Sequence, residues 1–175
     1  CITFYHFVYF QILAIIVDGE RVSTASIGKQ VSVVVNQTPF YGESGGQIGD
    51  SGVISCGEAL LSVEHAQKKL GDLHIHTGII SGGALEVGNE VTLEVNHQRR
   101  SGLRHNHSAT HLLHAALRRL LGDHVTQKGS LVTPDRLRFD IAHPKPITPD
   151  EISQVESQVN KEIRANSVVT TLLMT

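Results

Sequence analysis

The stretch NHSATHLLH, residues Asn106–His114, puts three histidines at positions i, i+4 and i+7 at the start of a strongly helical run. At about 100° per residue, His107, His111 and His114 fall on one side of a helix, while the alanines and leucines around them fall on the other. The histidines therefore form a face of their own. Two imidazoles one turn apart, here His107 and His111, can reach one metal ion, so the spacing is typical of a zinc site on a helix.

The metal hypothesis has an alternative, because this histidine spacing is common by chance and also fits a solvated polar helix face. A metalloprotease needs a glutamate directly after the first histidine, and Ser108 occupies that position, so protease chemistry is disfavoured. Zinc takes about four ligands, with one position left for water at a catalytic site. His114, or residues beyond Thr175, could supply the others.

The histidine helix belongs to the second of two predicted parts of the chain. Before it, short β-branched runs bounded by Gly, Asp or Asn predict strands and, at this spacing, a small β-barrel over residues 12–96. The predicted strands are Leu13–Val17, Val22–Ser26, Val31–Asn36, Gly52–Ser55, Leu61–His65, Leu73–Ile80 and Val91–Val95. A polar, basic stretch from Asn96 to Arg104 marks the boundary, and residues 1–11 are set apart as an atypical N-terminal segment.

The second part, residues 97–175, alternates between helices and strands, so the fold class predicted for the chain is α+β. Asn106 is expected to cap the histidine helix and Gly122 to end it. Thr148 opens a capping box with Pro149 at the first helical position. The predicted elements are a helix over 106–121, a hairpin with strands 131–133 and 137–141, a helix over 149–165 and a strand at Ser167–Met174.

Composition and charge disfavour several classes of protein for this chain, among them disulfide-rich secreted and membrane-spanning proteins. The chain has 175 residues, a net charge of -2, 11 histidines and two cysteines. Two cysteines are too few for a disulfide framework, which favours a reducing, intracellular compartment. The apolar start lacks a cleavage site and falls short of the ~20 apolar residues of a membrane span, so no membrane partner is expected. The overall charge does not predict nucleic-acid binding, but Arg99, Arg100 and Arg104 form a local basic patch.

A second motif, Phe40–Asp50, reads FYGESGGQIGD and holds four glycines within eight residues. Glycines remove side chains where the backbone turns tightly or approaches a ligand, and exposed N–H groups there can hold an oxygen-rich group. A plain glycine turn between strands is the simpler interpretation, and the neighbouring Tyr41 and Gln47 favour ligand contact. A third motif, QKGS at 127–130, is by composition only a helix-to-strand loop.

Taken together, three segments closely resemble the editing region of the alanyl-tRNA synthetase family in their order and spacing. They are PFYGESGGQIGDSG, RHNHSATHLLHAALRRLLGDHVTQKGSLV and LRFDIAH. The resemblance runs from about Leu13 to Thr175. It implies that the barrel is followed by an α/β editing core of the threonyl/alanyl-tRNA synthetase second-additional-domain type, truncated at its C-terminus. It also implies a zinc-containing hydrolase that removes serine or glycine wrongly attached to alanine tRNA.

The resemblance assigns roles to individual residues. It implies that His107 and His111 are half of the zinc ligand set, and that the rest comes from a Cys-x-x-x-His motif that this sequence lacks. It also implies that Thr110 contributes to the amino-acid pocket and that Gln127 is a functional editing residue. Thr110 and Gln127 are therefore the expected catalytic residues.

The remaining expectations concern the substrate and its surroundings. Gly45, Gly46 and Gln47 are implied to line the same region, and Arg104 is expected to contact the acceptor end of alanine tRNA. ATP and magnesium are expected only in a synthetic core that this sequence does not contain. No DNA partner is expected, and the expected location is cytoplasmic or organellar.

Two alternatives to a synthetase editing region stay open: a freestanding trans-editing deacylase of the same superfamily, and a tRNA-binding module without catalysis. Elementary energetics favour an editing function. An alanine site has only a methyl group to recognise, and the differences to glycine and serine are worth about 1–3 kcal/mol, so a second hydrolytic site is needed for accuracy.

Overall fold

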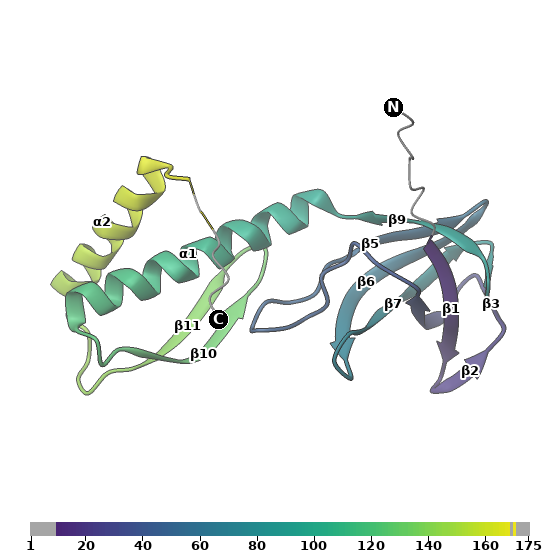
Figure 1. Ribbon diagram of the computed structural model, residues 1–175, viewed down its shortest axis with the longest axis horizontal. Helices are drawn as coiled ribbons and strands as arrows, with labels where there is room; N and C mark the ends of the chain where they lie inside the picture. The colour runs from purple at the N-terminus through teal and green to yellow at the C-terminus, as the bar shows by residue number, and fades with distance from the viewer. Residues whose placement is uncertain (1–9, 169, 171–175) are drawn as a thin grey trace, which may run out of the picture. The chain divides into compact units, whose positions relative to one another are not determined.

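A computed structural model describes residues 10–168 and Thr170. The chain divides into two compact units, with the division between Gly102 and Leu103. This point lies inside helix α1, His97–Leu121, which Figure 1 shows as one continuous ribbon. The described residues form antiparallel sheets and two helices, so the predicted α+β class is confirmed. Neither of these helices combines the length and the apolar content that a membrane crossing requires.

The first unit is built on a seven-stranded antiparallel sheet with the order β2-β1-β4-β7-β6-β5-β9. Its strands are β1 Phe10–Val17, β2 Glu20–Val22, β4 Gln30–Val35, β5 Gly52–Cys56, β6 Ala59–Lys69, β7 Leu73–Gly82 and β9 Glu90–Val95. A two-stranded sheet pairs β3, Thr24–Ser26, with β8, Ala84–Glu86. Every strand predicted before residue 96 has a counterpart, although Val22–Ser26 is divided between β2 and β3.

The predicted barrel is corrected to a curved sheet that closes over a short contact. Most of β1 pairs with β4, and only the residue pairs Phe10↔Val91 and Gln11↔Glu90 join β1 to β9. The register shifts between Ile12 and Ala14, close to the point where β1 changes partner, because a bulge bends the strand there. β2 pairs with β1 alone and stays outside the ring. Closure therefore depends on two residue pairs rather than on a full ladder.

The core of the first unit is filled by alternate side chains of this sheet. β4 and β9 each bury every second residue, as strands with one solvated face do. Large side chains of this sheet that are at most 1% exposed are Ile12, Ile15, Val33, Ile54, Leu61 and Ile80, and Leu85 of β8 is buried with them. A core of this size holds the strands that carry the glycine-rich loop.

His76 on β7 is a fully buried polar side chain in this core. Its Nδ1 lies 3.1 Å from the Val33 carbonyl oxygen and its Nε2 lies 2.8 Å from Thr38 Oγ1. A carbonyl oxygen only accepts, so Nδ1 carries the proton and the Thr38 hydroxyl donates to Nε2. The Phe40 ring packs edge-on at 5.2 Å. Both ring nitrogens are therefore satisfied while the imidazole is neutral.

We expect this histidine to make the chain less stable at mildly acidic pH. Burial lowers the pKa of His76 from 6.5 to about 4; the hydrogen bond to Val33 opposes this shift and the charge of His74 adds to it. An unfolded chain takes up the proton below pH 6.5, whereas the folded chain resists it. The free energy of unfolding should therefore fall by about 2 kcal/mol from this group between pH 7 and pH 5. Urea unfolding at the two pH values measures the loss, and an NMR titration of His76 near pH 6.5 would contradict it.

Helix α1 begins at His97, nine residues before the predicted start. Asn96 is its cap, because Asn96 Oδ1 accepts the Arg99 N–H at 2.9 Å and its carbonyl accepts the Arg100 N–H at 3.0 Å. The prediction that Asn106 caps the helix is wrong. The polar run 97–105 has no apolar stripe to signal a helix, and its stability comes from contacts with distant residues. Gly122, with φ +114°, ends α1 as predicted.

The second unit packs α1 and α2, Pro149–Ala165, with a hairpin of β10, Thr126–Val132, and β11, Leu137–Ala142. The capping box of α2 is confirmed, with Thr148 N–H donating to Glu151 and the Glu151 N–H donating to the Thr148 hydroxyl. The hydrophobic cluster of the second unit is small, and its buried members are Ala116, Leu117, Val125 and Val155. Leu103 and Val132 are buried outside this cluster. The predicted strand Ser167–Met174 lies largely outside the described residues.

Candidate functional site

His107 and His111 lie side by side on α1, as the sequence predicts for a ligand pair. Their ring centroids are 5.0 Å apart and their planes are inclined by 22°. His107 is half-buried and His111 is exposed. His114 does not join them, because its ring packs on Phe139 of β11 with a centroid distance of 5.2 Å. Its Nε2 is buried without a hydrogen-bond partner among the described residues. The paired face thus consists of His107 and His111.

The pair fits half of a zinc site. Imidazole nitrogens one helical turn apart are suitable zinc ligands, and a structural or catalytic site needs one or two more protein ligands. Within residues 10–168, no group of three or more His, Cys, Asp or Glu side chains is close enough to hold a metal ion. The expectation that further ligands come from outside this chain therefore stays a prediction.

Thr110 lies between the two histidines in sequence and, unlike them, is buried. Its side chain is 6% exposed, and its hydroxyl donates to the Asn106 carbonyl oxygen at 2.8 Å. Because that proton is used within the helix, the Thr110 oxygen is available to a ligand only as an acceptor in this conformation. This geometry leaves the predicted pocket role of Thr110 open.

Gln127 belongs to β10 and not to a loop, so the interpretation of QKGS as a helix-to-strand loop is wrong. Gln127 pairs with Ile141 and Gly129 pairs with Asp140, which leaves Lys128 as the extra residue of a β-bulge. Bulges of this kind re-aim side chains and are frequent beside active sites. Gln127 is exposed and lies five residues from Val132 at the tip of the hairpin.

The glycine-rich loop forms a tight turn that is tied to β6. Gly45 and Gly46 have φ +59° and +82°, and Ser44 and Gln47 exchange backbone hydrogen bonds across them. Positive φ at both central residues is the type I′ geometry that glycines favour. The Gln47 N–H already donates to Ser44, and both Gly45 and Gly46 are exposed at the turn. A Cβ at Gly49 would lie 1.8 Å from the Ala66 carbonyl oxygen, so this glycine allows close backbone packing.

Arg99 and Arg100 hold this loop to the start of α1 instead of facing solvent as an open basic patch. Arg99 Nη1 donates to the Gly49 carbonyl at 2.7 Å, and Arg100 Nη2 donates to the Pro39 carbonyl at 2.7 Å. Arg100 also forms an ion pair with Asp50, whose side chain is 1% exposed. Arg99 and Arg100 are therefore half-buried and paired within the first unit, and a role of this basic patch in nucleic-acid binding stays a prediction. Arg104 is exposed, and its predicted contact with RNA stays a prediction.

Sequence reasoning missed Asp50 and Asn106 as organising residues. Asp50 closes the glycine motif and accepts the Tyr41 N–H at 2.6 Å in addition to Arg100. Asn106 Nδ2 donates to the carbonyl oxygens of Thr133 and Pro134. The Asp50–Arg100 contact joins residues 50 positions apart and the Asn106–Thr133 contact joins residues 27 positions apart, so nothing in the local sequence specifies these partners.

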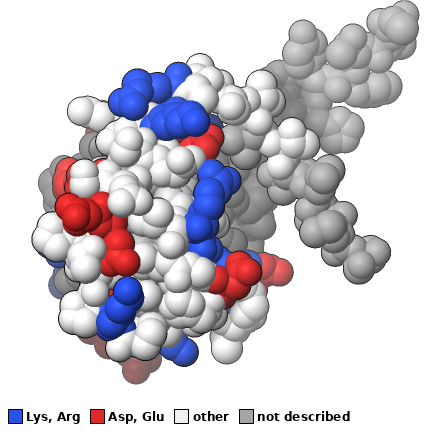
Figure 2. All heavy atoms as spheres, turned by 90° about the vertical axis from the view of Figure 1, so that its left-hand side faces the viewer, with Lys and Arg blue, Asp and Glu red and all other residues white. Residues whose placement is uncertain are grey.

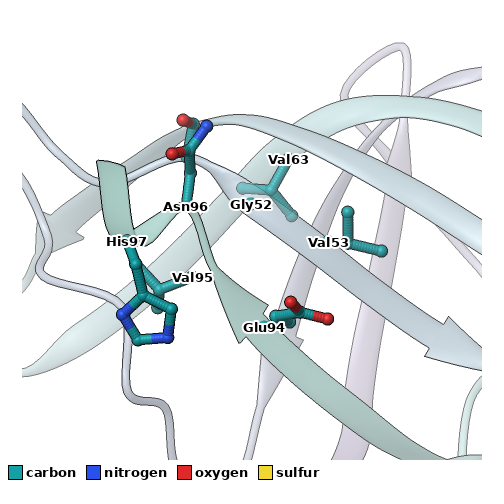
Figure 3. A pocket seen from close by; sticks show the side chains of 8 residues that line it. Gly52, Val53, Val63, Glu94, Val95, Asn96 and His97 are labelled. Carbon is teal, nitrogen blue, oxygen red and sulfur yellow. The ribbon is translucent and has the colours of Figure 1, made fainter. Parts of the chain in front are cut away.

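Two cavities among the described residues lie away from the predicted site. Figure 3 shows one of about 570 Å³ in the first unit, where β5, β9 and the start of α1 meet. It is lined by Ser51, Gly52, Val53, Val63, Glu94, Val95, Asn96 and His97. The other, of about 410 Å³, lies between α1 and α2 and includes Ala109, Leu112 and Ile163. Neither of these two is lined by Thr110, His107 or Gln127.

Charged side chains of both signs are interspersed on the face of the described residues that Figure 2 shows. On the face shown in Figure 2, Lys and Arg groups alternate with Asp and Glu groups. In the second unit Arg118 contacts Asp123 at 3.0 Å and Arg119 contacts Glu162 at 3.7 Å. These pairs are exposed and add little stability.

Residues 3–99 match the family model of class II tRNA synthetases (A), which is more than half of the chain. The chain therefore belongs to the family of class II tRNA synthetases. The match begins inside the segment 1–11 that the sequence analysis sets apart. Within that family, the similar curated proteins are alanine–tRNA ligases, which confirms the resemblance to alanyl-tRNA synthetases.

Three of these relatives are similar over nearly the whole chain. The ligases of Parvibaculum lavamentivorans and Granulibacter bethesdensis are 54% identical, and that of Rhizorhabdus wittichii is 55% identical, each over 166 residues or 94% of this chain. The match covers 19% of each relative. The chain thus spans about one fifth of the length of the curated relatives it matches.

Proposed function

We propose that this chain carries the editing site of an alanine–tRNA ligase and hydrolyses the ester that joins serine or glycine to alanine tRNA. The observation that supports this most strongly is the pair of parallel imidazoles, His107 and His111, on the same turns of α1 as the buried Thr110. The fold class proposed for residues 97–175 is the α/β editing core of the threonyl/alanyl-tRNA synthetase type. Identity to three alanine–tRNA ligases across both units supports the assignment.

The proposed site uses zinc as its metal. His107 and His111 would hold it together with ligands from outside this chain. When bound there, a zinc ion with an open position would supply orientation of a water molecule or of the ester end of the substrate. The chain itself supplies the rest: Thr110 shapes the amino-acid pocket and Gln127 positions substrate or water.

The proposed substrate is the acceptor end of alanine tRNA, in the cytoplasm or an organelle. The turn proposed to contact the aminoacyl end is formed by Gly45, Gly46 and Gln47. Arg104 is proposed to contact a phosphate group of the tRNA acceptor end. Phosphate contacts make such binding salt-dependent. ATP and magnesium belong to the synthetic core outside this chain.

Thr110 provides a test of selectivity. Replacing it with valine keeps the shape of the side chain and removes the oxygen that can accept a hydrogen bond from the serine hydroxyl. We expect deacylation of Ser-tRNA to fall about tenfold, because one hydrogen bond in the transition state is worth about 1–1.5 kcal/mol. Deacylation of Gly-tRNA, which has no hydroxyl to bind, should stay within about threefold. An equal loss for both substrates would contradict the pocket role.

The experiment that tests the proposed function is a segment exchange in the ligase of Parvibaculum lavamentivorans. The matching fifth of that ligase is replaced by the present chain, and hydrolysis of preformed Ser-tRNA and Gly-tRNA is measured beside alanine activation. We expect both hydrolytic activities to be retained. Binding of tRNA with no hydrolysis would favour the tRNA-binding module. Hydrolysis by the isolated chain at the rate of the exchanged ligase would favour a freestanding deacylase.

A further inference from the structure

Asn106 joins helix α1 to the tip of the β10–β11 hairpin. Its Nδ2 donates to the carbonyl oxygens of Thr133 at 2.8 Å and Pro134 at 3.0 Å, and its own carbonyl accepts the Thr110 hydroxyl. The tip is itself fixed, because the N–H and the hydroxyl of Thr133 both donate to the Arg136 carbonyl at 2.9 Å. A primary amide has two N–H donors, which matches two carbonyl acceptors. One side chain thus attaches the helix to a well-defined turn.

The apolar core of the second unit lies farther along α1. Leu113 is the first residue of α1 that packs against the cluster around Leu117 and Val155. His107 and His111 precede it. Leu103 and Thr110, on either side of His107, are also buried. The side chain of Asn106, directly before His107, adds two hydrogen bonds from this turn to the hairpin tip.

We propose that Asn106 is a positioning residue, which sets the histidine pair of α1 against the hairpin so that both imidazoles can bind one zinc ion. This inference rests on the proposed function. A metal site needs its ligands held to within about 0.5 Å, and a misplacement of about 1 Å costs roughly 100-fold in rate. Without the amide, the turn that carries His107 loses the hydrogen bonds that set its position against the hairpin tip.

The test uses the exchanged ligase with Asn106→Ala. Zinc affinity is measured by competition with a chromophoric chelator, and Ser-tRNA hydrolysis is measured at a temperature at which the protein is fully folded. We expect zinc affinity to fall about tenfold or more, the range seen when groups that orient metal ligands are removed. The kcat for hydrolysis should fall by a similar factor with KM within about threefold, and alanine activation should not change.

Val155→Ala is the matched control. Val155 is 5% exposed in the apolar cluster, and truncating it destabilises the same unit without touching the histidine turn. Zinc affinity and kcat should stay within about twofold in this variant. An equal loss in Val155→Ala, or unchanged zinc affinity in Asn106→Ala, would overturn the inference. An exchanged ligase that binds zinc but hydrolyses nothing would refute the proposed function alone, because the zinc measurement still decides the role of Asn106.

Discussion

Replacing Asp50 with alanine is expected to lower the free energy of unfolding by about 3 kcal/mol, because it leaves a partly buried cation without its partner. Arg100 is 31% exposed and its guanidinium donates to Asp50, whose side chain is 1% exposed. The same carboxylate accepts the Tyr41 N–H. The substitution therefore leaves two donors unsatisfied as well as one charge. Urea unfolding of the 175-residue chain at pH 7 measures the loss.

Asp72→Ala is the matched control, since Asp72 also contacts a cation but is exposed. Lys68 Nζ lies 2.7 Å from Asp72, whose side chain is 92% exposed. Such a surface pair is worth about 0.2–1 kcal/mol. In a double-mutant cycle, Arg100→Met should lower the free energy of unfolding by less in the Asp50→Ala background than in the wild-type chain. If Asp50→Ala lowers the free energy of unfolding no more than Asp72→Ala does, the glycine-rich loop is not held by the Asp50–Arg100 pair.

Replacing both His107 and His111 with alanine is expected to reduce Ser-tRNA hydrolysis by the exchanged ligase about 100-fold or more. In the proposed site the two imidazoles are the metal ligands that this chain contributes, so their loss would remove half of the ligand set of the ion proposed to orient water or the ester. Alanine activation should be unaffected because it belongs to a separate core. Zinc content, measured by atomic absorption, should fall in parallel.

His105→Ala controls for the loss of a histidine from the same helix. His105 is exposed and lies two residues before His107, on the side of α1 that faces the cavity shared with α2. Its replacement should change hydrolysis less than about threefold. Chelator-resistant hydrolysis by the double variant would refute the metal assignment.

The fold could be predicted where local signals determine it. Asp18-Gly19 gives the β1–β2 hairpin, with φ +51° at Asp18, and Thr148 with Glu151 gives the start of α2. These elements follow from turn and cap chemistry within four residues. The start of α1 could not be found in this way, because a polar run with Ser101 and Gly102 resembles a linker.

The candidate site was predictable in its motifs but not in its supporting contacts. The spacing of His107 and His111 determines that they share a helix face, and the structure places their rings together. Arg99 and Arg100 resemble a nucleic-acid patch in sequence because their partners, Gly49 and Asp50, are 50 residues away. Tertiary pairing of this kind carries no local sequence signal.

The most direct test of the central claim is the accumulation of Ser-tRNA by the exchanged ligase in the presence of serine, alanine tRNA and ATP. An intact editing site removes the mischarged product as it forms. We predict that Ser-tRNA stays near the level reached with the parent ligase and rises when His107 and His111 are replaced by alanine. Accumulation in the exchanged ligase equal to that in the double variant, with normal charging of alanine, would contradict the assignment of this chain as the editing segment.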